Sequence, residues 1–506
     1  MSQVINRNLL SRLFYGNSFQ LLKGVFTFLI SIVIARYLGP ENFGFYAFLI
    51  MSFTHIFSLV DFGLQNAFYT FTSAKIYHRN FYIFFLLGFM IQILIPLIIL
   101  FLFLPNDIFT GIFLSEDKNI VFLAFLSIVT QKNILLNITY LNESSRRSEI
   151  AQFFEFFTIF SQFILLVIFM RGDFNFLINH MFLIIIFCNL ASSFFSGLFI
   201  KIDFEKTEIS LAEFYNEIFP YLKGISIFVF IISILNFVDI WVLSKFAGYV
   251  EQSYFQIANR FSMGFIILLA ATSNIIWKEA ALLKNSKDEL LEFVSIFTNA
   301  FTFFAAFFCS ILFFSTGNSS DFLISFFFGN DYLTSESIFT FRIIILNVFF
   351  HTYGALIVSS FYGIQKGLTS YLIQTFSMIF GVFLVLFLVG DNSVSSLSLN
   401  LGASGLALKI LICSAIFHSL GYVVFFKELG FVAFLNLIRI YFQLIFLMIL
   451  MFFTKFYVSN FFENINSYIF FLTYNLIYLF LVLILVRYFP NIFGLQKISF
   501  YKNFLK

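Results

Sequence analysis

Residues 84–104 read FFLLGFMIQILIPLIILFLFL, an apolar run in which Gln92 is the one strongly polar side chain. An α-helix needs about 20 consecutive apolar residues to cross roughly 30 Å of hydrocarbon. Comparable runs recur along the chain, one of them between Tyr468 and Val486. Because a membrane β-barrel would instead alternate apolar and polar residues in segments of about ten, the pattern predicts membrane-spanning helices.

The composition of the whole chain agrees with this prediction. Of its 506 residues, 60% are hydrophobic and 11% are charged, whereas a soluble protein carries about 25% charged residues. Such a chain has too few polar side chains to cover a water-facing surface. Its net charge of +3 gives no indication of nucleic-acid binding, because the basic residues are scattered among the loops.

Polar breaks divide the apolar runs into predicted helices. The expected fold class is therefore an all-α integral membrane protein with about 14 transmembrane helices. Their approximate ranges are residues 13–35, 44–70, 81–104, 119–141, 150–170, 176–200, 219–243, 253–277, 293–315, 338–362, 367–389, 402–425, 432–454 and 466–488.

The distribution of basic residues predicts the orientation, because cytoplasmic loops of membrane proteins retain lysine and arginine. With the N-terminus inside, 17 of the 29 basic residues fall in predicted cytoplasmic segments and five fall in outer loops. The bias holds in alternate loops along the chain, so both termini are expected in the cytoplasm. The five outer residues are Arg36, Lys118, Arg171, Lys245 and Lys455.

A weak internal repeat joins two helix ends. Residues 36–39 read RYLG and residues 245–248 read KFAG, and an aromatic pair follows each glycine at the same spacing. Chance similarity of two turns is the alternative. A true repeat predicts two related six-helix lobes at residues 1–200 and 201–426, as in many transporters. Residues 427–506 would add two helices and a cytoplasmic tail.

The residues around the first of these turns carry a family resemblance. Residues 34–46 read IARYLGPENFGFY and residues 61–64 read DFGL, and together they resemble the N-terminal signature of the Wzx-type polysaccharide flippases. Residues 239–258 resemble the corresponding turn of the second lobe. These flippases belong to the multidrug/oligosaccharidyl-lipid/polysaccharide exporter superfamily, which also contains multidrug and toxin extrusion antiporters and the lipid II flippase.

The motif residues themselves are expected to be structural. Gly39, Pro40 and Gly44 are expected to form a tight turn outside the membrane, and Gly63 to allow close helix packing.

The resemblance implies two six-helix bundles around a cavity that opens alternately to either side of a bacterial inner membrane. The implied cargo is an undecaprenyl-pyrophosphate-linked repeat unit of O-antigen, and hence of lipopolysaccharide, or of capsule. The implied partners are membrane lipid, this lipid-linked oligosaccharide, a glycan polymerase and a chain-length regulator. Neither enzymatic activity nor a metal or other cofactor is expected, and H⁺ or Na⁺ would drive transport.

Cations inside predicted helices are the main candidates for cargo binding, because a charge at membrane depth normally faces a wet cavity or a partner. Lys23 shares a helix face with amide and hydroxyl side chains, and Lys132 and Arg260 have similar neighbours. Cations pair with phosphate oxygens, and amides and hydroxyls match sugar hydroxyls. The predicted cavity residues are Gln20, Lys23, Thr27, Lys132, Asn133, Asn137, Gln256, Asn259, Arg260 and Arg342.

Each cation has an alternative role. It would simply neutralise an intramembrane carboxylate such as Asp61, Glu155 or Asp239, and Arg342 lies near enough to the outer surface to snorkel. Asp61 and Asp239 are equally candidates for ion coupling, because desolvation favours uptake of a proton by a carboxylate.

Two other functions compete with the flippase. An antiporter for drugs or organic cations would need a cavity of carboxylates and aromatic rings rather than buried lysine and arginine. A membrane glycan polymerase would need a large outer loop with paired arginines, and a membrane acyltransferase would need a histidine clustered with aspartate or serine. The sequence has neither pattern and no glycine-rich phosphate loop.

Overall fold

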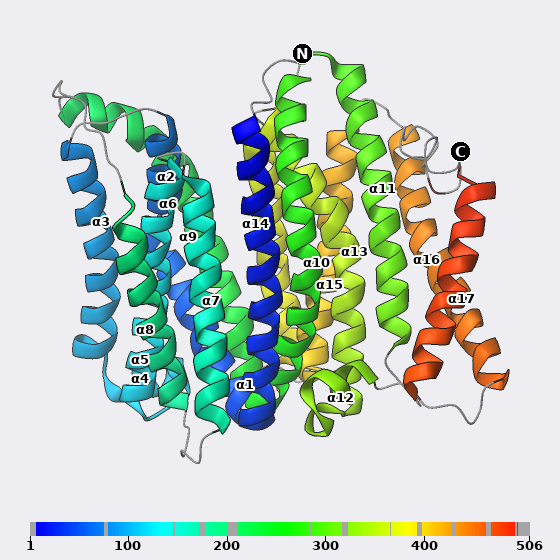
Figure 1. The fold of residues 1–506 in the computed structure, drawn as a ribbon, viewed down its shortest axis with the longest axis horizontal. Coiled ribbons are helices and arrows are strands. Elements are labelled where there is room, and N and C mark those ends of the chain that lie inside the picture. Colours follow the sequence, from blue (N-terminus) through cyan, green and yellow to red (C-terminus); the bar gives the residue numbers. More distant parts are fainter. Residues whose placement is uncertain are drawn as a thin grey trace. The chain divides into compact units, whose positions relative to one another are not determined.

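The computed structural model describes residues 7–74, 79–144, 147–171, 178–200, 211–283, 285–315, 322–364, 366–391, 397–427, 431–461, 467–490 and 493. All regular secondary structure within these residues is helical, which confirms the predicted all-α fold class. The chain forms two compact units, Met1–Gln252 and Ser253–Lys506, and their helices are shown in Figure 1.

Unit 1, Met1–Gln252, contains the first nine α-helices and the beginning of the tenth. Two π-helical segments interrupt it, η1 (Ile99–Phe103) and η2 (Val129–Leu135). The α-helices are α1 (Arg7–Asp61), α2 (Leu64–Ala74), α3 (Arg79–Ile98), α4 (Asn106–Phe113), α5 (Lys118–Ile128), α6 (Leu136–Ser144), α7 (Ser148–Arg171), α8 (Ile178–Gly197) and α9 (Leu211–Phe246).

Unit 2, Ser253–Lys506, contains the rest of α10 (Gly248–Leu282) and the remaining helices. Its central element is α13, which packs against α11 and α15. These helices are α11 (Lys287–Phe314), α12 (Phe322–Phe328), the 3₁₀ helix η4 (Asn330–Tyr332), α13 (Ser335–Gly363), α14 (Gly367–Val389), α15 (Gly402–Phe425), α16 (Phe431–Phe461) and α17 (Ser467–Tyr488).

Every one of the predicted transmembrane ranges overlaps a described helix. Within the described residues, 12 helical stretches are long and apolar enough to cross a membrane. One of them, Ser18–Asp61, breaks at Gly39 and so covers most of the predicted helix 13–35 and the greater part of the predicted helix 44–70. α10, with 35 residues, covers the predicted helix at 253–277 but is not one of the 12. The chain is therefore a multi-pass membrane protein.

The two repeated turns share a backbone conformation as well as a sequence pattern. Gly39 breaks α1 with φ 70°, and Gly248 begins α10 with φ 89°. Both values lie in the region that favours glycine, because a Cβ would clash with the backbone there. Pro40 follows the first break, where its fixed φ suits the first turn of a new helix. The division into lobes at residue 200 stays a prediction.

One motif glycine has a role other than the predicted one, and another lies at a chain break. Gly44 does not belong to a turn. It lies within the part of α1 that follows Gly39, against the backbone of Tyr249, where an added Cβ would be 1.7 Å from the Tyr249 carbonyl oxygen. Gly63 has φ 79° and belongs to the break between α1 and α2, and its predicted part in close helix packing stays a prediction. The signature therefore encodes chain breaks and one backbone-to-backbone contact.

Side chains near Gly248 hold the short helix α4 in place. The Trp241 indole donates a hydrogen bond of 3.0 Å to the Gly111 carbonyl, and the Tyr249 hydroxyl donates one of 2.7 Å to the Leu114 carbonyl. Lys245 places its ammonium 4.4 Å from the centre of the Trp241 ring, which is a cation–π contact. Leu114 ends α4 in a left-handed conformation, so the tyrosine bond satisfies a carbonyl at that helix end.

The part of α1 that precedes Gly39 lies beside α7, and this pair of helices positions the candidate site (Figure 1). Aromatic rings form much of their contact: Phe26 lies 5.1 Å from Phe160 and 5.4 Å from Phe163 between ring centroids. Phe19 similarly contacts Phe153 at 5.6 Å. Edge-to-face rings at these separations stabilise a helix pair beyond the area that they bury.

Candidate functional site

A cavity of about 130 Å³ lies within unit 1, where α1, η2, α6, α7 and α8 meet. Lys23 and Lys132, two of the predicted cargo-binding cations, both line it. One carboxylate and a set of amide, hydroxyl and aliphatic groups form the rest of its wall. The lining residues are Lys23, Gln131, Lys132, Leu135, Leu136, Glu155, Thr158, Ile159 and Asn189.

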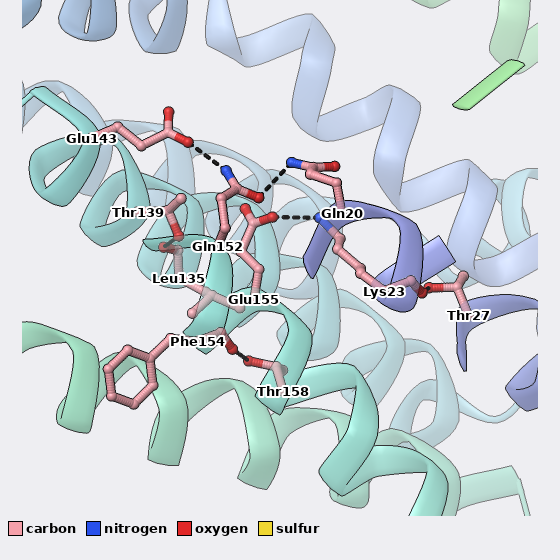
Figure 2. A network of polar contacts seen from close by, with 10 residues as sticks. All are labelled: Gln20, Lys23, Thr27, Leu135, Thr139, Glu143, Gln152, Phe154, Glu155 and Thr158. Atoms are coloured by element: carbon pink, nitrogen blue, oxygen red, sulfur yellow. Dashed lines mark hydrogen bonds and ion pairs between the residues drawn. The ribbon is translucent and has the colours of Figure 1, made fainter. Parts of the chain in front are cut away.

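Lys23 forms an ion pair with Glu155 at the edge of this cavity (Figure 2). The Lys23 Nζ atom lies 2.5 Å from Glu155 Oε2. The Lys23 side chain is 34% exposed, whereas that of Glu155 is 13% exposed. The expected alternative, neutralisation by an intramembrane carboxylate, is therefore present at Lys23, and the pair also faces the cavity.

A second polar chain runs beside the ion pair (Figure 2). Gln20 donates to the Gln152 side-chain oxygen at 2.5 Å, and Gln152 donates in turn to Glu143 at 2.5 Å. The Gln20–Gln152 and Lys23–Glu155 contacts each join residues 132 positions apart, so α1 and α7 run parallel here. Gln20 thus belongs to the predicted polar face, but it links helices rather than lining the cavity.

The π-helical segment η2 carries Lys132 into the cavity wall. A π turn widens the helix by one residue and leaves carbonyl oxygens to be satisfied from outside. The Gln65 side chain supplies one such bond, since it donates a hydrogen bond of 2.6 Å to the Lys132 carbonyl. The adjacent Asn133 side chain donates a hydrogen bond of 3.0 Å to the Phe89 carbonyl on α3 and one of 3.2 Å to the Gln92 side-chain oxygen.

Asp61 belongs to the same polar network. Its carboxylate accepts the Gln65 backbone N–H at 3.1 Å, as an N-terminal cap of α2. It also accepts the Gln92 side-chain amide at 3.0 Å. Gln92 therefore links Asp61 to Asn133 and so to η2. The ion-pair partner of Lys23 is Glu155 rather than Asp61, and ion coupling at Asp61 stays a prediction.

Replacing Asn133 by leucine is expected to destabilise unit 1 by about 1–3 kcal/mol, the usual effect of leaving a buried hydrogen-bonding group unsatisfied. The Gln92 side-chain oxygen loses its donor and the π segment loses its bonds to α3. The midpoint of thermal unfolding in detergent measures the effect. Thr473→Ala is the matched control, because that exposed hydroxyl only bonds its own helix; an equal shift in both variants would contradict the network.

Several other predicted residues lie outside the described cavity lining. The Thr27 hydroxyl bonds the Lys23 carbonyl at 2.8 Å on its own helix, a common arrangement for threonine within helices. The Asn137 amide bonds the Asn133 carbonyl at 2.6 Å. Asp239 is buried on α9. For all three, a role in transport stays a prediction.

The remaining candidates belong to unit 2. Gln256, Asn259 and Arg260 follow one another along α10, with Gln256 buried. Arg342 on α13 places its guanidinium carbon 5.5 Å from the centre of the Phe313 ring on α11. This cation–π contact gives Arg342 a packing role within unit 2. Cargo binding by these four residues stays a prediction.

Seven residues of the lining are absent from the predicted cavity set. Three are aliphatic, and the four polar ones are Gln131, Glu155, Thr158 and Asn189. Asn189 donates to the Thr130 hydroxyl at 3.2 Å and accepts from Gln162 at 3.2 Å, so it is held rigidly on α8. Glu155 carried a signal in the sequence, since it is an acidic residue within the apolar run 150–170. Gln131 and Asn189 also interrupt apolar runs, but they carry no charge.

Comparison with solved structures shows which fold this is. The chain matches a lipid II flippase, MurJ, in an inward closed conformation, with a TM-score of 0.68, 15% identity, and coverage of 98% of this chain and 99% of the other. It also matches a multidrug resistance MATE family transporter of the MOP superfamily in an inward-facing conformation, with a TM-score of 0.56, 15% identity, and coverage of 80% and 95%.

A transporter described in the same words, in an outward-facing conformation, matches with a TM-score of 0.54, 13% identity, and coverage of 82% and 95%. No family model and no curated protein sequence matches the chain. At these identities the likeness establishes the fold, which is that of MOP superfamily transporters, with near-complete coverage of the MurJ structure.

Proposed function

We propose that this protein is a flippase that translocates undecaprenyl-pyrophosphate-linked oligosaccharide repeat units across a bacterial inner membrane for surface polysaccharide biosynthesis. The observation that carries the proposal is the juxtaposition of Lys23 and Lys132 on one polar cavity within the membrane-spanning helices of unit 1. Two cations at membrane depth are costly unless they serve a wet cavity or an anionic ligand.

The chemistry of the cavity fits the pyrophosphate end of such a cargo. Lysine ammonium groups form charge-assisted hydrogen bonds with phosphate oxygens, and Gln131, Thr158 and Asn189 add uncharged donors and acceptors. The volume of about 130 Å³ is well below the roughly 300–1,000 Å³ of pockets that enclose drug-sized ligands. The cavity therefore suits a compact anionic group, with the glycan and the polyprenyl tail outside it.

Alternating access would move the cargo. Transporters of this fold have been observed both inward-facing and outward-facing, and one protein with the fold is described as a lipid II flippase. In this mechanism the substrate site is exposed first to one side of the membrane and then to the other, while the polyprenyl tail stays in lipid. Asp61 or Asp239 would couple the movement to H⁺ or Na⁺. Such a carrier has no catalytic residues.

The same cavity argues against the competing functions. Its lining holds two lysines and one glutamate, whereas a site for organic cations would need a net negative charge. An enzyme of this fold would need a reactive group in the cavity, and a lysine–glutamate pair beside amides is better suited to binding. The distribution of lysine and arginine supports placing both termini in the cytoplasm.

A transport assay with purified protein tests the proposal. Proteoliposomes would contain a fluorescent undecaprenyl-pyrophosphate oligosaccharide in both leaflets, and a membrane-impermeant quencher would report the fraction in the outer one. With protein present, we expect the quenched fraction of the fluorescence to exceed the fraction of lipid in the outer leaflet and to approach one. Without protein, we expect it to stop at the outer-leaflet fraction. Quenching that stops at the outer-leaflet fraction, together with uptake of a fluorescent organic cation, would favour the antiporter instead.

A further inference from the structure

We propose that Glu155 is an internal counter-anion that holds Lys23 while the site is empty and gives it up to the anionic cargo. The inference rests on the proposed function, because it names the regulation of that same cavity. It assigns to a carboxylate, rather than to the cations, the task of making cargo binding reversible.

The geometry places Glu155 where it competes directly with a ligand. Its carboxylate lies 2.5 Å from the Lys23 ammonium, and both residues, with Lys132, line one cavity. A phosphate that approached Lys23 would have to replace this contact. With a third of its side chain exposed, Lys23 has room to turn from the carboxylate toward a ligand, whereas the more buried Glu155 stays in place.

The ion pair is not the main attachment between α1 and α7. Rings of Phe19 and Phe26 pack against four phenylalanines of α7 at centroid distances of 5.1 to 5.8 Å. The Gln20–Gln152 hydrogen bond adds a polar link one turn away. Partly exposed ion pairs contribute about 0–1 kcal/mol to stability. The helix pair therefore remains assembled when Lys23 leaves Glu155.

Several titratable groups lie around Glu155. They are Lys23 on α1, Lys132 on η2, and Glu143 and Tyr140 on α6. The cavity lining itself holds two lysines and one carboxylate. A bound pyrophosphate would leave the Glu155 carboxylate beside like charge and without its cation, which opposes binding of the cargo.

Glu155 and the cargo therefore compete for Lys23. When Glu155 reclaims Lys23, the cargo loses one of the two cations that hold it. The carboxylate and the anionic cargo are thus negatively coupled. The carboxylate thus lowers the affinity of the empty site while it speeds the departure of cargo.

Binding of undecaprenyl pyrophosphate to the detergent-solubilised full-length protein tests this inference. Glu155→Gln is expected to bind at least about fivefold more tightly than the wild type, a typical size for a coupling between two ligands, because the cargo no longer competes with a carboxylate for Lys23. Its flipping rate is expected to fall, because release slows.

Matched variants separate this role from a structural one. Glu155→Asp keeps a carboxylate and is expected to bind with nearly the wild-type affinity, and Glu116→Gln, on an exposed loop, is expected to behave like the wild type. Weaker binding by Glu155→Gln would make Glu155 a structural clamp and overturn the inference. Unchanged affinity would overturn it as well, while leaving the flippase intact; absence of binding by the wild type would instead reject the proposed function.

Discussion

Replacing Lys132 by glutamate is expected to reduce flipping of pyrophosphate-linked cargo at least about 100-fold. The change turns the net charge of the cavity lining from positive to negative, because Lys132 and Lys23 are its two cations and Glu155 its one anion. A hydrogen bond to a charged group contributes about 1.5–3 kcal/mol, and each 1.4 kcal/mol corresponds to a factor of about ten. The lost attraction and the added repulsion together therefore reduce flipping by more than two factors of ten.

The initial flipping rate in proteoliposomes measures this effect, at protein amounts matched by chromatography. Lys118→Glu is the control, because Lys118 is an exposed cation near the ring of Phe109, outside the cavity. We expect its rate to stay within about twofold of the wild type, as for surface substitutions in general. A Lys132→Glu protein that flips cargo at the control's rate would show that the cavity is not the anion site.

The second large effect is expected at Gly44. An added Cβ would lie 1.7 Å from the Tyr249 carbonyl oxygen and 2.6 Å from its carbonyl carbon. Neither atom can rotate away, because both belong to the backbone. Gly44→Ala should therefore destabilise unit 1 by about 3 kcal/mol or more, at or above the upper end for overpacking.

Thermal unfolding in detergent and the yield of monodisperse protein measure this loss. Gly111→Ala is the matched control, since a Cβ there would meet nothing within 4 Å. Equal unfolding midpoints for Gly44→Ala and Gly111→Ala would mean that the two backbones approach each other less closely than the structure has them.

Much of the fold could be predicted because hydropathy alone determines which segments span a membrane. Apolar runs of about twenty residues admit one backbone solution when they are not alternating, and each predicted range overlaps a helix. The breaks inside helices are harder to predict from the sequence. Gly39 was recognised as a turn, but the separation of α2 from α1 at Phe62 and Gly63, both with positive φ, interrupts a run that reads as continuous.

The candidate site was predictable in part. An intramembrane lysine with amide neighbours is rare enough to mark a cavity, and Lys23 and Lys132 do share one. The sharing itself could not be predicted, because it depends on the π-helical register of η2, which periodicity arguments do not contain. The same register directs Asn133 toward α3 rather than toward the cavity.

The pairing of Lys23 with Glu155 shows a further limit. The two residues are 132 positions apart, and their contact depends on how α1 and α7 pack, so several carboxylates were equally good partners from the sequence. The hydroxyls of Thr27 and Ser31 bond carbonyls of their own helix, and the sequence pattern does not distinguish this arrangement from contact with a ligand. A polar stripe on a helix therefore indicates a buried or wet face without saying which of its side chains reach a ligand.

Protection of position 131 by cargo tests the central claim most directly. In a protein whose three native cysteines, Cys188, Cys309 and Cys413, are replaced by alanine, Gln131→Cys, which lines the same cavity and leaves both lysines in place, would be labelled with a membrane-impermeant thiol reagent. We expect labelling from the aqueous phase, and we expect undecaprenyl pyrophosphate, but not undecaprenol, to slow it at least about fivefold. Labelling that both lipids leave unchanged, or no labelling from water under any condition, would contradict an anion-binding cavity at Lys23 and Lys132.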